Sequence, residues 1–438
     1  MLRYIQIALA VLLTSFYFFP FEFTFLPGVN TKMAMAGVGL VLLGLQLGKA
    51  RNQLFSKDMV TISAYALLVS LTSFIAVTLN ETRDYTYVSY IISMWVWLSA
   101  AYVAVSVMRK IHGYVSVELV CNYLIAVCVF QCVSALLIDF VPAVKHFAIA
   151  YISDLGPTQM ELMKESGRLF GFGATLDPAG SRFSAVLAII AFLGARIAQT
   201  THQKFAIWYI LAFLLIAVVG NMIARTTTVG IIIALVYLLY ATGLHRLTIN
   251  KRTGYFILWL GGVLLVAIPL LTLLYHTNEQ IHDNLRFAFE GFFSLAEKGR
   301  WEVHSNEILK NMVVFPDNWK TWIVGDGYMI NPNLTDPYYT GEYHKSGYYM
   351  LTDIGYLRFI FYGGIPCLLA MAVFIWKSGR IGMRKFQDYS MLFWLLLAVN
   401  FTVWLKVSTD IFLAIALFLV MKQEDAKTHE DLPELPEA

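Results

Sequence analysis

The feature that most constrains this chain is a series of apolar blocks, each roughly 16 to 25 residues long, separated by charged breaks. Blocks of that length cross the hydrocarbon core of a bilayer as helices. The 438 residues are 58% hydrophobic and only 14% charged, whereas an ordinary soluble domain carries about 25% charged residues. These values exclude a soluble globular enzyme and a disordered protein, and short alternating segments typical of an outer-membrane barrel are not visible. The sequence therefore predicts an all-α polytopic membrane protein.

The apolar blocks predict about twelve transmembrane helices. Their approximate limits are residues 3–21, 33–48, 59–79, 86–107, 114–138, 183–199, 205–222, 228–243, 254–275, 353–376, 389–406 and 408–421. The last two share one long apolar block, so their boundary is the least defined. We expect helices 1 to 9 within residues 1–275, helices 10 to 12 within 353–421 and a cytoplasmic tail at 422–438.

Lysine and arginine residues gather in alternate breaks between the blocks, which is the positive-inside pattern. The predicted cytoplasmic breaks hold, among others, Arg3, Lys49, Arg51, Lys57, Arg109, Lys110, Arg196, Lys204, Lys251, Arg252, Arg384 and Lys385. This pattern places both termini in the cytoplasm. It leaves two long segments on the outer side, a re-entrant segment at about 139–182 and a large loop at 276–352. The first block is expected to be an uncleaved span and not a signal peptide.

The large loop between helices 9 and 10 is predicted to form a small cap. It contains fourteen aromatic residues and ten acidic residues against six cations, which is too aromatic for a disordered segment. Its first half ("RWEVHSNEILKNM") favours helix, and its second half ("NPNLTDPYYTGEYHKSG") favours turns. Aromatic faces beside acidic and amide side chains are what carbohydrate recognition requires.

Two arginines at the predicted outer surface need an explanation, because a charge near membrane depth is costly without a partner or a function. Arg225 lies in "NMIARTTTVG", where hydroxyls and the amides of a helix start suit a phosphate group. Arg168 lies in "SGRLFGFGATLDPAGSRF", a glycine-rich segment with Asp177 and Arg182. The alternatives are an arginine that extends to the lipid headgroups for Arg225 and an internal Asp–Arg pair for the second segment.

Further candidate residues lie in and after the large loop. Arg300 opens the predicted helix "GRWEVHSNEI" and is either an anion ligand or the partner of a nearby surface glutamate. Asp353 and Arg358 flank "DIGYLR", where the chain returns to the membrane, and Asp353 is either a helix cap or a functional carboxylate. His344 lies nine residues before Asp353 and is a second candidate base.

The layout and four motifs resemble the O-antigen polymerase and ligase superfamily of bacterial envelope proteins, the Wzy and WaaL type. The hairpin "ARTTTVG" at 224–230 is similar to the small-residue, arginine and Ser/Thr hairpin of that family. The segments 299–328 and 352–366 resemble its loop motif, which ends in Gly-x-Gly, and the segment that enters helix 10. The segment 167–180 fits its upstream arginine and Gly/Pro motif more weakly.

This resemblance implies a GT-C-like membrane fold and glycosyl transfer at the periplasmic face of the bacterial inner membrane. The donor would be a glycan on undecaprenyl diphosphate, and the acceptor a second lipid-linked repeat unit. For this reaction our hypothesis is that Arg225 and Arg168 bind the diphosphate, with Arg300 or Arg358 as additional candidates. Many ligases have His-Asn where this chain has Thr352-Asp353, which favours a polymerase and leaves the base open between Asp353 and His344. We expect no metal, no cofactor and no nucleic acid, with a chain-length regulator protein as a possible partner.

Three alternatives remain open from the sequence. One is an O-antigen ligase, which would transfer the glycan to lipid A–core. Another is a transporter or flippase for lipid-linked sugars, for which Lys406 and Asp410 in the last hairpin are the best support. The third is a non-catalytic scaffold or chain-length regulator, which would need no buried arginines on the outer side.

Overall fold

The computed structural model describes residues 2–47, 56–153, 167–199, 203–243, 251–332 and 347–422 of the chain. Within these ranges the regular structure is helical, and β-pairing is limited to three isolated bridges. The expected all-α fold class is therefore confirmed for the part of the chain that the structure describes.

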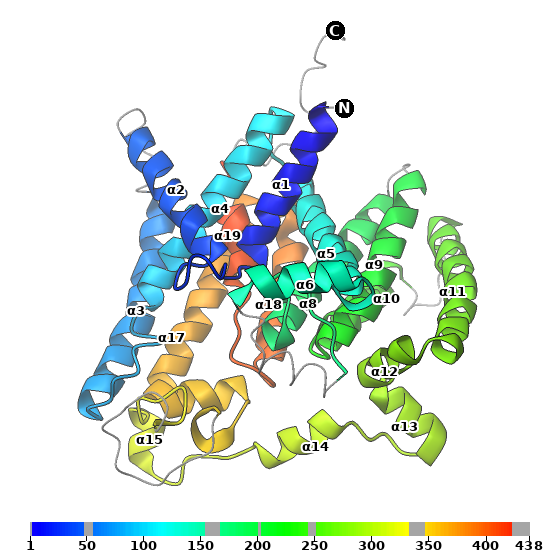
Figure 1. Cartoon of the computed structure of the whole chain (residues 1–438). Coiled ribbons are helices and arrows are strands. Elements are labelled where there is room, and N and C mark those ends of the chain that lie inside the picture. Colours follow the sequence, from blue (N-terminus) through cyan, green and yellow to red (C-terminus); the bar gives the residue numbers. More distant parts are fainter. Residues whose placement is uncertain are drawn as a thin grey trace.

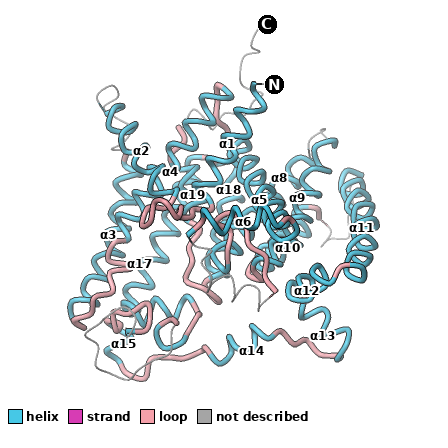
Figure 2. The backbone as a smooth tube through the Cα atoms, in the orientation of Figure 1, coloured by secondary structure: helices cyan, strands magenta, loops and turns pink. Residues whose placement is uncertain are grey.

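Each predicted apolar block coincides with one helix of a bundle (Figure 1; Figure 2). The helices are α1 (Leu2–Phe18), α2 (Thr31–Leu47), α3 (Lys57–Leu79), α4 (Tyr90–His112), α5 (Val117–Phe140), α8 (Leu176–Gln199), α9 (Gln203–Ile223), α10 (Thr227–Ala241), α11 (Lys251–Thr277), α17 (Gly355–Lys385), α18 (Ser390–Val403) and α19 (Phe412–Leu419). Five of the described helices, namely α3, α4, α5, α8 and α17, are long and apolar enough to cross a membrane. Twelve crossings, their orientation and the division into domains stay predictions.

Local signals fix where several of these helices begin and end. The hydroxyl of Ser56 accepts a hydrogen bond from the amide of Met59 at the start of α3, and Ser116 does the same for Leu119 at the start of α5. Gly113 ends α4 in the left-handed conformation with φ of 79°, which glycine adopts without steric cost. The helix boundaries therefore follow from capping residues as well as from apolar composition.

The last two bundle helices lie in the centre of the molecule (Figure 1). α18 has 14 residues and α19 has 8, whereas a helix that crosses a bilayer needs about 20. All residues of α19 are buried, and it packs against α4 and α17. The apolar block at 389–421 is thus two separate short helices joined by a loop, and two full crossings are not confirmed there.

Short helices follow one another along one end of the bundle, opposite the end where α1 begins (Figure 1). They are α12 (Glu279–Ala288), α13 (Glu290–Lys298), α14 (His304–Asn311), α15 (Trp319–Ile323) and the 3-10 turn Tyr349–Leu351. We call α12 to α15 the loop layer. Helix in the first half of the large loop is confirmed, although α14 begins at His304 and not at the expected Arg300. A further short helix, α6 (Pro142–Tyr151), lies across the bundle in the same view.

At a break in α17, the helix backbone binds loop 325–327, which follows α15 at one end of the loop layer. Gly364 has φ of 71°, and Pro366 has no amide to donate to the carbonyl of Tyr362, so the hydrogen bonds of the helix are interrupted next to the carbonyls of Phe361 and Tyr362. Two backbone amides of loop 325–327 donate to these two carbonyls at 2.6 and 3.0 Å. The Gly-x-Gly of one motif therefore binds the Gly-Gly break of the other, and this satisfies polar backbone groups within an apolar bundle.

The contact between α8 and α10 depends on small residues. A Cβ atom on Gly230 would lie 2.3 Å from the Cα atom of Ser184. The Ser184 hydroxyl accepts from the amide of Gly230 at 3.1 Å and donates to the carbonyl of Thr226 at 2.9 Å. Such close backbone approach through small residues is the usual way in which membrane helices associate.

We expect Gly230→Ala to lower the stability of the protein by about 1–3 kcal/mol, because the added methyl group forces α10 away from α8. Gly194→Ala in α8 is the matched control, since a Cβ there meets nothing within 4 Å and gains helix propensity. Thermal unfolding of both variants in detergent measures the difference. Equal melting temperatures for the two variants would contradict this account of the α8–α10 contact.

Candidate functional site

Charged side chains from four connections meet beneath the loop layer. The connections are the segment before α8, the α9–α10 turn, the segment before α17 and the α18–α19 loop, and they supply Arg168, Arg225, Asp353 and Lys406, respectively. These residues are far apart in the sequence, and electrostatic interactions link them in the folded chain. We call this group, with Asp177 and Arg358, the outer charged cluster.

Asp177, in the first turn of α8, joins three of these connections. Its Oδ1 atom accepts a hydrogen bond of 2.5 Å from the Thr226 hydroxyl and lies 3.1 Å from Nζ of Lys406. Lys406 also donates to the Thr226 hydroxyl at 3.2 Å. The alternative of an internal Asp–Arg pair in this segment is not what the described residues show, because the ion-pair partner of Asp177 is Lys406 and Arg168 acts on it only electrostatically.

Arg225 and Arg168 both face the aromatic ring of Phe287 in α12. Their guanidinium carbons lie 4.1 and 5.0 Å from the ring centroid, a separation at which a ring attracts cations. Nη1 of Arg225 lies 2.5 Å from a carboxylate oxygen of Glu290 and donates to the Ser305 hydroxyl at 3.2 Å. The Nε atoms of both arginines are buried without a hydrogen-bond partner among the described residues, so each retains capacity to donate to an anion.

Asp353 lies two residues before α17 and does not cap it. The N-cap residue of α17 is Ile354, without a side-chain hydrogen bond, and Oδ1 of Asp353 is buried with no partner among the described residues. Burial raises the pKa of the Asp353 carboxyl above its ordinary value, and the Asp177 carboxylate raises it further. Cations at Arg358, Lys406 and Arg168 oppose this shift. The carboxyl is therefore placed to exchange a proton at higher pH than an ordinary aspartate.

Arg358, in the first turn of α17, is 6% exposed. A cation buried to this extent needs a partner or a function. Its guanidinium carbon lies 3.4 Å from the ring centroid of Tyr348. Its Nε atom, like those of Arg168 and Arg225, is buried without a hydrogen-bond partner in the ranges that the structure describes. Arg358 and Arg168 are thus two arginines that act electrostatically on the Asp353 carboxyl.

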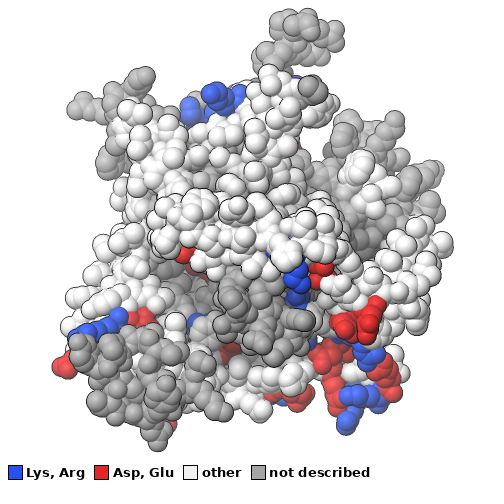
Figure 3. Space-filling view, in the orientation of Figure 1, with Lys and Arg blue, Asp and Glu red and all other residues white. Residues whose placement is uncertain are grey.

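A pocket of about 530 Å³ opens beside Arg225 in the loop layer. Its lining includes Arg286, Phe293, Ser294, Lys298, His304 and four glutamates, Glu290, Glu297, Glu302 and Glu307. Acidic side chains gather over this part of the surface at the lower right of Figure 3. Aromatic, hydroxyl and carboxylate groups together can bind a polyol by stacking and hydrogen bonding. Among the described residues, no group of three His, Cys, Asp or Glu side chains is placed to hold a metal ion.

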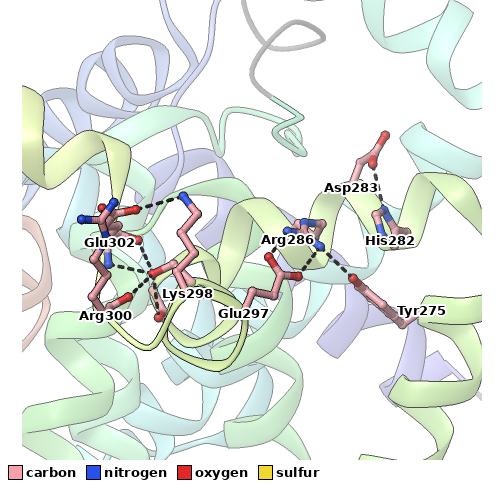
Figure 4. A network of polar contacts seen from close by, with 10 residues as sticks. Tyr275, His282, Asp283, Arg286, Glu297, Lys298, Arg300 and Glu302 are labelled. Carbon is pink, nitrogen blue, oxygen red and sulfur yellow. Dashed lines mark hydrogen bonds and ion pairs between the residues drawn. The ribbon is translucent and has the colours of Figure 1, made fainter.

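Arg300 does not join the outer charged cluster in the described structure. It lies in the exposed turn before α14, and its Nε is 2.7 Å from one carboxylate oxygen of Glu302 (Figure 4). The other carboxylate oxygen of Glu302 lies 2.9 Å from Nζ of Lys298. Nearby, Arg286 binds both carboxylate oxygens of Glu297 at 2.8 Å. The surface-pair alternative for Arg300 fits this geometry better than an anion ligand. His344 lies outside the described residues.

A second charged group lies next to the cluster at the starts of α2 and α4. The Tyr90 hydroxyl donates to Oδ2 of Asp410 at 3.0 Å, and the amide of Phe412 donates to Oδ1 at 3.0 Å. Arg182 and Lys32 act on Asp410 electrostatically. We call these residues the inner charged group. Asp410 therefore has hydrogen-bond donors and cations around it. Lys406, which the sequence analysis named together with Asp410, pairs instead with Asp177 of the outer charged cluster.

Sequence reasoning missed the loop residues that contact Arg225, among them Glu290 and Phe287. Both lie in an acidic, aromatic segment with many similar residues, so composition alone could not single them out. They lie on either side of the junction between α12 and α13, which the sequence did not mark. Comparisons with family models, curated proteins and solved structures found no match to this chain.

We expect Lys406→Met to destabilise the protein by about 1–3 kcal/mol, because it removes the cation that faces the half-buried Asp177 carboxylate. Adding Asp177→Asn should restore most of the loss, since no unpaired charge remains. Thermal unfolding of the two single variants and the double variant gives the coupling. The exposed pair Lys298–Glu302 serves as the control, with a coupling under about 1 kcal/mol. Strictly additive losses at positions 177 and 406 would rule out the pairing.

Proposed function

We propose that this chain is a membrane glycosyltransferase of the polysaccharide polymerase type. It joins undecaprenyl-diphosphate-linked oligosaccharide repeat units into O-antigen, capsule or exopolysaccharide at the periplasmic face of the bacterial inner membrane. The observation that carries the proposal is the convergence of Arg168 and Arg225 on Phe287, with Asp353 in electrostatic range of Arg168. Cations that suit a diphosphate thus lie near a carboxyl that suits a hydroxyl proton.

Arginines fit the donor because the diphosphate is the leaving group of the reaction. The acceptor hydroxyl oxygen forms a bond to the anomeric carbon of the donor glycan, and the bond from that carbon to the phosphate oxygen breaks. The diphosphate keeps the electron pair, so its negative charge increases in the transition state. Unpaired guanidinium N–H groups at Arg168, Arg225 and Arg358 can donate to that developing charge, which is an effective form of electrostatic catalysis.

Asp353 fits the role of general base for the acceptor hydroxyl. Its buried Oδ1 atom has no competing donor among the described residues, and its raised pKa brings its proton affinity closer to that required near neutral pH. The proton of the acceptor hydroxyl would pass to this carboxylate as the new glycosidic bond forms. His344 remains the alternative base from the sequence.

The pocket beside Arg225 supports a glycan as the other half of the substrate. Its volume of about 530 Å³ lies within the range of ordinary ligand sites. Phe287 and Phe293 supply aromatic faces, and the glutamates supply acceptors for sugar hydroxyls. A lipid-linked glycan presents an anion and a polyol side by side. The outer charged cluster suits the anion, and the neighbouring pocket suits the polyol.

Two other functions remain as candidates. An O-antigen ligase would use the same donor site with lipid A–core as acceptor. A transporter of lipid-linked sugars is favoured by one observation, the inner charged group around Asp410, since charges within a bundle are typical of substrate or ion pathways.

The purified protein, incubated without metal with a short lipid-diphosphate-linked repeat unit from its host, should yield a product ladder with spacing of one repeat unit. Arg225→Ala should lower kcat/KM by about 100-fold, because a donor to the leaving group is lost. Arg384→Ala changes an exposed arginine at the end of α17, whose partner is Asp58, and should change the rate less than about twofold.

The outcomes of this assay separate the candidates. Transfer that requires added lipid A–core would identify a ligase. No transfer with either acceptor would reject the glycosyltransferase and favour transport. A full rate in Arg225→Ala would leave the reaction intact but exclude Arg225 as a diphosphate ligand.

The rate of polymerisation should fall on the acid side of the pH profile as Asp353 becomes protonated, because a base acts only when it is deprotonated. Since the pKa of Asp353 is raised, this fall should begin at higher pH than for an ordinary aspartate, whose pKa is about 3.9. The profile of kcat/KM against pH measures it, with Asp353→Asn as the comparison. An unchanged acid limb in Asp353→Asn would assign the base to another residue.

A further inference from the structure

The loop layer places one of its own carboxylates on an arginine of the outer charged cluster. Glu290 is the first residue of α13, and its Oε2 atom lies 2.5 Å from Nη1 of Arg225. Its Oε1 atom accepts a hydrogen bond of 3.1 Å from the backbone amide of His304, where α14 begins. One carboxylate therefore connects the α9–α10 turn of the bundle to two helices of the loop layer.

Phe287 strengthens this contact from the end of α12. It lies three residues before Glu290, and its ring faces the guanidinium groups of Arg225 and Arg168. The joint between α12 and α13 thus covers both arginines with an aromatic face and a negative charge. By contrast, α14 has no buried residues. The hydrogen bond from the His304 amide to Glu290 is therefore important for the position of its first turn.

A carboxylate and a phosphate group use the same donors of a guanidinium, and a diphosphate carries more charge than a carboxylate. The side chain of Arg225 is 16% exposed and that of Glu290 is 34% exposed, so an incoming anion can reach the pair. We propose that Glu290 is an internal anionic ligand of Arg225 which the lipid diphosphate displaces. This inference rests on the proposed function, because it concerns the same diphosphate site.

Displacement has a consequence for the neighbouring pocket. Glu290 lines that pocket together with His304 and Phe287. In this proposal the displaced Glu290 carboxylate moves away from both Arg225 and the His304 amide. The start of α14 then keeps the Ser305 contact to Arg225 but loses the Glu290 link, and the pocket wall formed by α13 and α14 can adjust. Binding of the diphosphate would in this way prepare the sugar pocket, and the two parts of one substrate would be coupled.

The alternative is that Glu290 is a permanent link that holds Arg225 in the geometry required for binding. The two accounts predict changes of opposite sign. If Glu290 competes with the diphosphate, its neutralisation tightens anion binding. If Glu290 only positions Arg225, its neutralisation weakens anion binding.

The first experiment measures the affinity of the full-length protein in nanodiscs for inorganic pyrophosphate by calorimetry. Glu290→Gln should bind pyrophosphate about fivefold more tightly, at the low end of typical coupling between competing contacts. Asp58→Asn also removes a carboxylate charge from an arginine, Arg384, but outside the pocket beside Arg225, and should change the affinity less than about twofold. Unchanged or weaker binding in Glu290→Gln, or equal tightening in both variants, would overturn the proposal.

Hydrogen exchange of the unmodified protein gives a second test that needs no variant. Saturating pyrophosphate should increase exchange at the amide of His304 at least several-fold, because Glu290 no longer accepts its hydrogen bond. Unchanged or slower exchange at His304 in bound protein would overturn the displacement.

Two further variants separate failure of this inference from failure of the proposed function. Arg225→Ala and the conservative Arg225→Lys are measured in the same binding assay, with melting temperatures as a check on folding. If pyrophosphate binding is lost in Arg225→Ala but Glu290→Gln shows no gain, the diphosphate site stands and the displacement is rejected. If both arginine variants fold and bind pyrophosphate normally, the diphosphate assignment itself fails, and the displacement with it.

Discussion

The ion pair and hydrogen bonds of Asp177 are the constraint on which the outer end of the bundle depends. A half-buried carboxylate needs several partners, and Asp177 finds them in the α9–α10 turn and the α18–α19 loop through Thr226 and Lys406. Three connections therefore occupy fixed relative positions. The places of Arg225 and Asp353 follow from this junction, because each lies in or next to a segment that it fixes.

The irregular backbone around this junction is as important as the charges. Glycine allows the chain to bend at Gly364 and to lie close at Gly230, and carbonyls released by a bend are bound by another segment. Irregular backbone within an apolar bundle is tolerated where its polar groups find protein partners. The motifs around 325–327 and 361–364 thus fit each other, which gives a structural reason for their occurrence in one chain.

Much of the architecture could be predicted from hydropathy, because apolar length determines where helices form in such a chain. The cluster around Arg168 and Arg225 was also accessible, since an unexplained cation near an apolar block signals a partner or a function. The partners were not accessible. Lys406 as the partner of Asp177, and Glu290 as the partner of Arg225, depend on contacts between residues more than 60 positions apart. Arg300 shows the converse, because motif position suggested a ligand where the fold provides a surface ion pair.

The charges of α17 limit which part of this long apolar helix could lie in a hydrocarbon core. A straight helix of 31 residues would be about 46 Å long, well beyond the roughly 30 Å of a hydrocarbon core. The uncharged residues from 359 to 376, between Arg358 and Lys377, span about 27 Å, which is close to that core with little tilt or bilayer deformation. The four residues of α17 before this stretch, which end at Arg358, and the nine after it, which begin at Lys377, then need no place among the acyl chains. The break at Gly363 and Gly364 thus lies within the apolar stretch, where loop 325–327 supplies hydrogen bonds that acyl chains could not supply.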